Sequence, residues 1–248
     1  MAADSLAMPI SLLLAILIIS IATVIQRCFG IGLGLIAAPL LFLLNPHYVP
    51  LTVLSCGFLL SLAGVIQARR QLNWRRVFPA LLARIPGAWL GALLLSWLSP
   101  AMLAIGLGLT LLAATTLSWK TLSLSGNRRQ LAVAGFFSGL LATTTSVGGP
   151  PMALVYQQQA RHQARDELAL FFLAGTPVSL LLLALHGHIS AQHQALLLPV
   201  LPGVWLGYVI ARRLDNKLPQ NSVKPVLLLF SALSAMLITY QGVSTLRG

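Results

Sequence analysis

Apolar runs of roughly 20 residues recur along this chain, and no other feature limits its possible folds as strongly. The runs at 49–68, 77–98 and 168–185 are each close to the length that a helix needs to cross a bilayer core of roughly 30 Å. Only 8% of the 248 residues are charged and 57% are hydrophobic, whereas a soluble domain carries roughly 25% charged residues. The sequence therefore predicts an all-α polytopic membrane protein, surrounded by the lipid bilayer.

Basic residues outnumber acidic ones, and the formal net charge is +12. They lie in short loops between the apolar runs, which is typical of a membrane topology signal rather than of a nucleic-acid-binding surface. Nucleic acid is therefore not an expected partner. Cys28 and Cys56 both lie in apolar runs and are predicted to be buried thiols outside any disulfide.

Two polar, glycine-rich breaks interrupt the apolar pattern. The first break is Arg27-Cys-Phe-Gly-Ile-Gly-Leu-Gly34, and the second is Thr143-Thr-Thr-Ser-Val-Gly-Gly-Pro-Pro-Met152. A straight helix over residues 9–44 would be about 54 Å long, too long for one crossing. We therefore expect the chain to fold back at each break, either as a re-entrant hairpin or as two crossings.

An internal duplication divides the chain into two halves. Pro86-Gly-Ala-Trp-Leu-Gly91 and Pro202-Gly-Val-Trp-Leu-Gly207 agree at five of six positions, and transporters are often built from such repeats with the substrate between them. The glycines of each Gly-x-x-x-Gly are expected to serve close helix packing. The sequence thus predicts one transmembrane domain over 1–248. Its expected parts are repeat 1 (9–119), a polar linker (120–130) and repeat 2 (131–243), each repeat having one broken segment plus three full spans.

Loop charge predicts the orientation of these repeats. If each broken segment enters and leaves on the same side, four loops share one face and hold 13 of the 16 Lys and Arg residues: 69–76, 120–130, 157–167 and 212–224. The positive-inside rule makes that face cytoplasmic. The two repeats are then inverted relative to each other. Both termini are predicted on the non-cytoplasmic side of the cell (inner) membrane.

The second break contains groups that suit an anion. Backbone left unpaired at membrane depth is tolerated only where it is buried in protein or lines a wet cavity. Gly148 and Gly149 allow unusual backbone angles, and Pro150 suits the first turn of a helix whose free N–H groups favour negative charge. Thr144, Thr145 and Ser146 add hydroxyl groups. The alternative is a kinked helix in which the threonines bond to their own turn.

The first break adds a cation. Arg27 directly precedes the glycines, and a cation in a membrane segment is costly and usually functional, although it could instead snorkel to the surface. Arg84 lies about eight residues into its own span, and we expect a structural, snorkelling role for it. The predicted substrate-binding residues from both breaks are Arg27, Phe29, Gly30, Gly32, Gly34, Thr144, Thr145, Ser146, Gly148, Gly149 and Pro150.

Catalytic and metal-binding patterns are absent from the sequence. None of the four acidic residues lies in the middle of a span, and Asp166 and Glu167 are expected to cap the start of a helix. His186, His188 and His193 are expected in a solvated loop rather than around a metal. We therefore predict no catalytic residues, no metal and no cofactor, and a protein that is not an enzyme.

At these residues the sequence resembles the sulfite exporter TauE/SafE family of bacterial membrane proteins. The family's Gly-rich stretch before Pro-Leu-Leu is matched by Phe29–Leu41, and its small-residue run ending in Gly-Gly-Pro-Pro is matched by Gly139–Pro151. Arg165-Asp-Glu-Leu-Ala-Leu-Phe-Phe172 is similar to the start of the family's next helix. The resemblance implies an inner-membrane permease for sulfur-containing anions such as sulfite, sulfoacetate or related organosulfonates.

We therefore expect a secondary transporter that moves a small anionic substrate by alternating access around two broken helices. Two alternatives remain open at this point: a channel or uniporter for a small neutral solute, and a membrane scaffold without transport. The pattern is also compatible with a homo-oligomer. Solute, direction and coupling ion are not predicted.

Overall fold

The computed structural model describes residues 2–30, 32–68, 72–119, 124–214 and 220–247. Every regular element in these ranges is a helix. The α-helices are α1 (Ala2–Phe29), α2 (Leu33–Leu44), α3 (Leu51–Gln67), α4 (Trp74–Trp97), α5 (Pro100–Trp119), α6 (Arg128–Thr145), α7 (Gly149–Val155), α8 (Arg161–Leu185), α9 (Ala191–Leu197), α10 (Leu201–Leu214) and α11 (Gln220–Arg247). Two short 3-10 helices, η1 (Pro46–Tyr48) and η2 (Leu198–Val200), complete the set.

Seven segments among the described residues are long and apolar enough to cross a membrane. They comprise α1, α3, α4, α5, α8, the continuous α9–η2–α10 segment and α11. The predicted all-α, multi-pass membrane class is therefore confirmed. The spans predicted at 49–68 and 77–98 match α3 and α4 to within three residues, whereas α8 begins seven residues before the predicted 168–185.

Both breaks occur where the sequence predicted them. In the first, α1 ends at Phe29 and α2 begins at Leu33, and Gly30 and Gly32 between them have φ angles of 81° and 150°. Such angles disfavour residues with a Cβ atom, so the two glycines permit this turn. In the second, Ser146 adopts the left-handed conformation with a φ of 64° and ends α6, and Pro150 stands in the first turn of α7.

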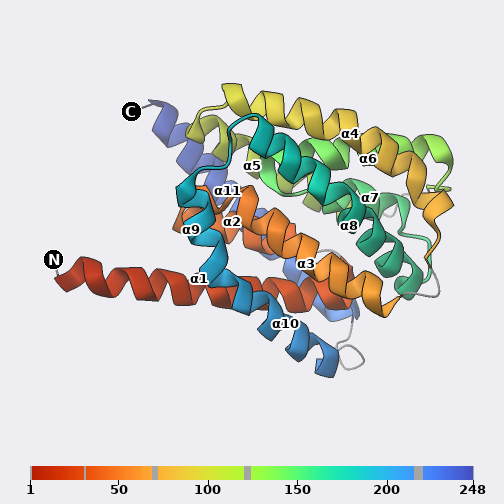
Figure 1. The fold of residues 1–248 in the computed structure, drawn as a ribbon, viewed down its shortest axis with the longest axis horizontal. Coiled ribbons are helices and arrows are strands. Elements are labelled where there is room, and N and C mark those ends of the chain that lie inside the picture. The colour runs from red at the N-terminus through yellow and green to blue at the C-terminus, as the bar shows by residue number, and fades with distance from the viewer. Residues whose placement is uncertain (1, 31, 69–71, 120–123, 215–219, 248) are drawn as a thin grey trace.

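Each break joins a long helix to a short one. At ~1.5 Å per residue, α1 and α6 are about 42 and 27 Å long, whereas α2 and α7 reach only about 18 and 10 Å. The short arms therefore do not cross the roughly 30 Å hydrocarbon core on their own. Within these arms, α2 lies in the middle of the helical bundle (Figure 1), and eight of its 12 residues are buried.

The helices of the two halves pack on each other reciprocally. Helix α4 of the first half packs along α6, the long arm of the second break, and α10 of the second half packs along α1. The remaining partners, α3 with α8 and α5 with α11, also join one half to the other. In this arrangement (Figure 1), the described residues of both breaks are mostly buried.

Glycines of the duplicated hexamer make the two reciprocal contacts possible. A Cβ atom on Gly91 would lie 2.7 Å from the carbonyl oxygen of Leu140 in α6, and one on Gly203 would lie 2.7 Å from that of Ile16 in α1. Gly87 and Gly207, the other two glycines, abut the carbonyl oxygens of Phe136 and Ser20. The expected packing role of these glycines is thus confirmed.

Both termini lie at one end of the bundle (Figure 1), and the ends of α3, α7 and α10 and the starts of α4 and α8 lie toward the other. Parts of the basic loops predicted at 69–76, 120–130 and 212–224 fall outside the described residues. Within the predicted linker, Arg128, Arg129 and Gln130 already belong to α6. We refer below to this second end, which carries the described basic loop residues, as the basic end.

Replacing Gly87 by alanine is expected to destabilise the protein by about 1–3 kcal/mol, because the added methyl group overpacks the backbone contact between α4 and α6. The apparent melting temperature in detergent, followed by circular dichroism, would measure the loss. Gly106→Ala is the matched control, because a Cβ atom on Gly106 would have no neighbour within 4 Å. The control should be neutral or slightly stabilising, and equal melting temperatures for the two variants would contradict the packing role.

Candidate functional site

A cavity of about 50 Å³ lies where the two breaks meet, and we call it the central pocket. Gly32 and Gly34 line it from the first break, and Ser146, Gly148, Gly149 and Pro150 line it from the second. Arg84, Ser61 and Thr176 add polar groups from α4, α3 and α8. Six of the eleven residues predicted from the sequence are therefore brought together around one cavity.

The two breaks touch directly at this pocket. A Cβ atom on Gly34 would lie 2.5 Å from the carbonyl oxygen of Ser146 and 3.3 Å from the Cα atom of Val147. The Ser138 hydroxyl donates to the carbonyl oxygen of Gly148 at 2.6 Å, and the Ser146 hydroxyl donates to that of Pro50 at 3.1 Å. The first bond closes the second break onto α6, and the second ties this break to the start of α3.

The threonines of the second break do not donate into the pocket. The Thr144 and Thr145 hydroxyls donate to the carbonyl oxygens of Leu140 and Leu141, at 2.9 and 2.8 Å, within their own helix. Neither residue lines the central pocket. The expectation that they supply hydroxyl donors to a substrate is therefore not met in this conformation, and the back-bonded arrangement is the one observed.

Arg84 is the main site residue that sequence reasoning missed. Its side chain does not snorkel: only 1% of the residue is exposed. The guanidinium lies 4.9 and 5.7 Å from the ring centroids of Phe171 and Phe172. Its two terminal nitrogens reach the hydroxyls of Ser138 and Ser179 only at 3.4 Å, and its Nε atom has no hydrogen-bond partner.

The surroundings of Arg84 compensate its charge only in part. No carboxylate oxygen of the described residues lies within 4 Å of it. Removing an isolated charge from water costs several kcal/mol, whereas a desolvated cation–π contact contributes about 2 kcal/mol. Gly139 and Gly175 make room for the side chain, since a Cβ atom on either would overlap it. A buried cation lining a cavity and held mainly by aromatic rings is suited to a negatively charged ligand.

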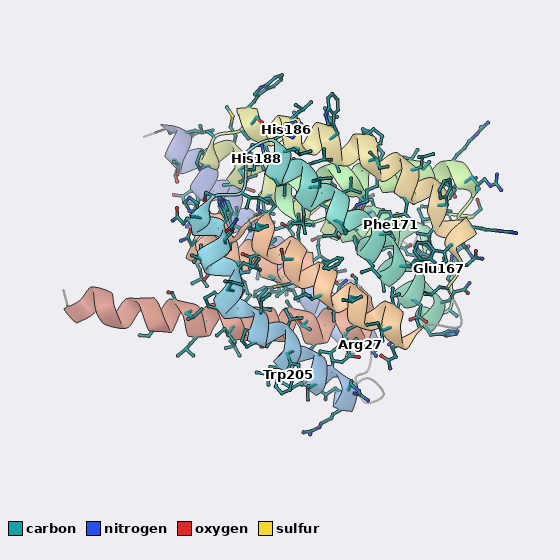
Figure 2. All side chains as sticks on the ribbon, viewed as in Figure 1. Arg27, Glu167, Phe171, His186, His188 and Trp205 are labelled. Atoms are coloured by element: carbon teal, nitrogen blue, oxygen red, sulfur yellow. The ribbon has the colours of Figure 1, made fainter. Side chains whose placement is uncertain are left out.

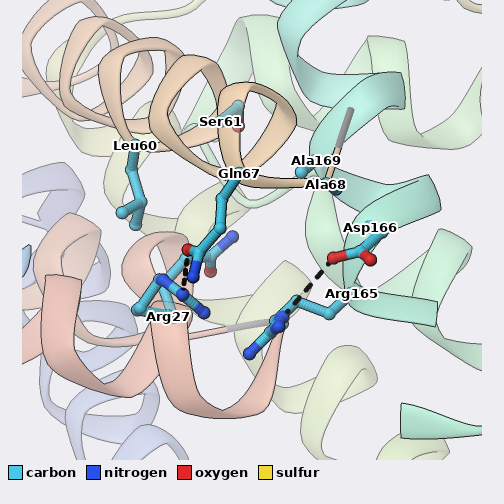
Figure 3. A pocket seen from close by; sticks show the side chains of 11 residues that line it. Arg27, Leu60, Ser61, Gln67, Ala68, Arg165, Asp166 and Ala169 are labelled. Atoms are coloured by element: carbon cyan, nitrogen blue, oxygen red, sulfur yellow. Dashed lines mark hydrogen bonds and ion pairs between the residues drawn. The ribbon is translucent and has the colours of Figure 1, made fainter. Parts of the chain in front are cut away.

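Arg27 lies in a different cavity, of about 90 Å³, at the basic end of the bundle (Figure 3), and we call it the end pocket. Gly30, Gln67, Arg165 and Asp166 are among its other lining residues. Arg27 is only 5% exposed, donates to the Oε1 atom of Gln67 and lies 5.8 Å from the centroid of the Tyr208 ring. Arg27 therefore does not snorkel to the surface. The sequence predicted one shared site for Arg27 and the second break, but the two line different cavities.

Phe29 is the remaining predicted site residue. It ends α1 at the first break, and its side chain lies outside the described part of the structure.

Glu167 does not cap a helix, contrary to expectation. It is the seventh residue of α8, is 1% exposed and lies 3.5 Å from the Nε atom of Arg76, while Gln163 donates to its other oxygen at 3.3 Å. Burial and the negative charge of Glu167 both raise the pKa of the neighbouring Tyr156, so its phenol stays protonated. These groups join α4, α7 and α8 near the basic end, away from His186 and His188 (Figure 2).

The histidines lie at the end of the bundle that carries the termini. The rings of His186 and His188 stack with centroids 6.4 Å apart, and the Nε2 atom of His188 lies 3.0 Å from the carbonyl oxygen of Ala92. His188 is therefore attached to α4 rather than freely solvated. Among the described residues there is no group of three or more His, Cys, Asp or Glu side chains that could hold a metal ion. Cys28 and Cys56 are buried and form no disulfide, as predicted.

Comparison with known proteins identifies the family. The family model described as "Sulfite exporter TauE/SafE" matches residues 14–238, nearly the whole chain. The chain belongs to this family. A TauE/SafE relative from Cupriavidus necator, named "Probable sulfite/organosulfonate exporter TauE", is 27% identical over 205 residues, which cover 77% of this chain and 79% of the relative. No solved structure matches the chain.

Family membership confirms the resemblance seen in the sequence. It identifies this TauE/SafE protein as a membrane transporter rather than an enzyme. The two breaks, through which the family was recognised, are also the segments that line the central pocket of this member.

Two arginines of α4 are expected to affect stability in opposite directions. Arg84→Met should leave the ligand-free protein equally stable or up to about 3 kcal/mol more stable, because it removes a buried charge that no carboxylate compensates. Arg76→Met should destabilise by about 3 kcal/mol, because it leaves the buried Glu167 without its cation. Apparent melting temperatures in detergent would test both. A large loss of stability in Arg84→Met would show that the guanidinium is a structural element.

Proposed function

We propose that this transporter carries small sulfur-containing oxyanions, such as sulfite or an organosulfonate, and that the anion binds in the central pocket. The observation that carries the proposal is the buried Arg84 guanidinium, which faces the meeting point of the two breaks without a carboxylate partner. The name of the Cupriavidus necator relative, a probable sulfite/organosulfonate exporter, supports the same substrate class.

Guanidinium chemistry suits this class of ligand. Arginine presents several N–H donors in a fixed planar fork that matches two oxygens of one anion, and such charge-assisted bonds are about twice as strong as neutral ones. In this chain, Arg84 makes only long bonds of 3.4 Å to Ser138 and Ser179, so an oxyanion offers it better acceptors. An entering anion would also supply the missing countercharge.

The other features of the central pocket also suit a small polar ligand. The first turn of α2 begins there, and N–H groups at the start of a helix have no acceptor within that helix. The volume of about 50 Å³ exceeds the roughly 10–15 Å³ that one water requires. A compact oxyanion fits this size better than a bulky organic molecule does.

Alternating access is the proposed transport mechanism, with the two halves as inverted repeats over 9–119 and 131–243. The reciprocal packing of α4 on α6 and of α10 on α1 supports two equivalent halves, which could tilt around a fixed site between them. The basic end is proposed to face the cytoplasm and both termini the outside of the inner membrane, because the four predicted basic loops hold 13 of the 16 Lys and Arg residues.

Arg84→Gln is expected to reduce sulfite flux into proteoliposomes by about 10–100-fold, because a charge-assisted hydrogen bond contributes about 1.5–3 kcal/mol. Arg75→Gln is the matched control: it removes a cation from the same helix at an exposed position and should retain flux. Initial rates of ³⁵S-sulfite uptake, at equal amounts of reconstituted protein, would measure both.

The same assay separates the alternatives. Flux that does not depend on solute charge, and that persists in Arg84→Gln, would favour a channel for neutral solutes. The absence of flux for every solute tested, with well-folded protein, would favour a scaffold. Either outcome would overturn the proposed substrate class.

A further inference from the structure

Gly57 of α3 lines the central pocket, and its surroundings differ from those of other glycines there. A Cβ atom on Gly34 would lie 2.5 Å from a carbonyl oxygen of the second break, and one on Gly148 would lie 2.6 Å from the Cβ atom of Ala142. A Cβ atom on Gly57 would meet only the Cδ2 atom of Leu33 among the described residues, at 3.9 Å, an ordinary van der Waals distance. Close packing therefore requires glycine at the first two positions but not at position 57.

The position of Gly57 within its helix also calls for an explanation. It is the seventh of the 17 residues of α3, and a glycine in a helix interior is less stable than alanine, so it usually has a packing or a functional reason. Gly64, about two turns further along α3, has a packing reason, because a Cβ atom there would lie 3.1 Å from that of Ala169 in α8. At Gly57, the missing side chain instead leaves part of the central pocket open.

The pocket wall around Gly57 is apolar. Val53 and Leu54 line the pocket from the same face of α3, since residues three or four apart on a helix are neighbours. Leu33 of α2 faces the same position. Arg84 lines this cavity too, and its Nε atom has no hydrogen-bond partner among the described residues. One cavity thus combines a cation for an anionic group with open space beside an apolar wall.

We propose that Gly57 is a specificity-determining residue, and that the space beside it admits a short carbon chain on the sulfur atom while Arg84 binds the sulfonate oxygens. This inference rests on the proposed function and deepens it, because it assigns small alkanesulfonates to the central pocket and names the residue that limits their size. One methylene more or less in an apolar pocket changes binding about 10–200-fold. A methyl group at position 57 takes the place of about one carbon atom of such a ligand.

Competition against ³⁵S-sulfite uptake into proteoliposomes tests the proposal. The inhibition constants of methanesulfonate, ethanesulfonate and propanesulfonate are each divided by the KM for sulfite of the same variant. The ratio for ethanesulfonate should rise at least about 10-fold in Gly57→Ala, and further in Gly57→Val. Gly106→Ala is the matched control: it adds a methyl group to a glycine of α5 that does not line the central pocket, and every ratio should stay as in the wild type.

Thermal unfolding in detergent shows whether the fold is kept. Gly57→Ala should melt at the wild-type temperature or above it, because the described neighbours leave room for the methyl group and alanine favours a helix.

Leu33→Val in the Gly57→Ala background is a second test. The shorter side chain withdraws the apolar group that faces position 57 and returns space to the pocket. The ethanesulfonate ratio should then fall several-fold from its value in Gly57→Ala, a selective rescue that a general packing defect would not show.

Equal changes for sulfite and for all three sulfonates in Gly57→Ala and Gly57→Val would overturn the role of Gly57 while the proposed function stands. Sulfite uptake that none of the three sulfonates inhibits in the wild type would do the same. No sulfite flux in the wild type, or flux that is unchanged in Arg84→Gln, would overturn the proposed function and this inference with it.

Discussion

Backbone N–H and C=O groups at membrane depth must be hydrogen-bonded or shielded from lipid. The whole structure depends on how this chain does so at its two breaks. Lipid offers no hydrogen bonds, so a helix can stop inside the bilayer only where protein or trapped water takes over its free groups. Here the two breaks touch where Gly34 abuts the carbonyl oxygen of Ser146, and Ser138 and Ser146 tie the second break to α6 and to the start of α3. Substitution of either break would therefore affect both.

Close helix packing makes this mutual covering possible. The breaks can meet only if their long arms, α1 and α6, are held at a fixed depth, and α10 and α4 hold them through glycines that admit the facing carbonyl groups. Without a hydrophobic driving force between helices in lipid, such small-residue contacts are a main source of helix association. The duplicated hexamer thus positions the pocket without lining it.

The two arginines of α4, Arg76 and Arg84, have different electrostatic roles. Arg76 pairs with Glu167 of α8 and lies over the ring of Tyr156, which follows α7, and this is a structural use of a basic group. Arg84 instead faces the central pocket, and its contacts are with two hydroxyls and aromatic rings. A buried cation without a carboxylate costs stability in the empty protein, and a bound anion would recover that cost.

Residue pattern alone determined the membrane class, the spans and the location of both breaks, because apolar length and glycine or proline interruptions act locally along the chain. It also indicated the family, since the two break motifs keep their order. The division of Arg27 and Arg84 between two cavities, the back-bonded threonines and the Arg76–Glu167 pair were decided only by tertiary structure. Whether Arg84 reaches the surface or stays buried depends on Gly139, Gly175 and Phe171, which lie at least 55 residues away in the sequence and meet it only when α6 and α8 pack against α4.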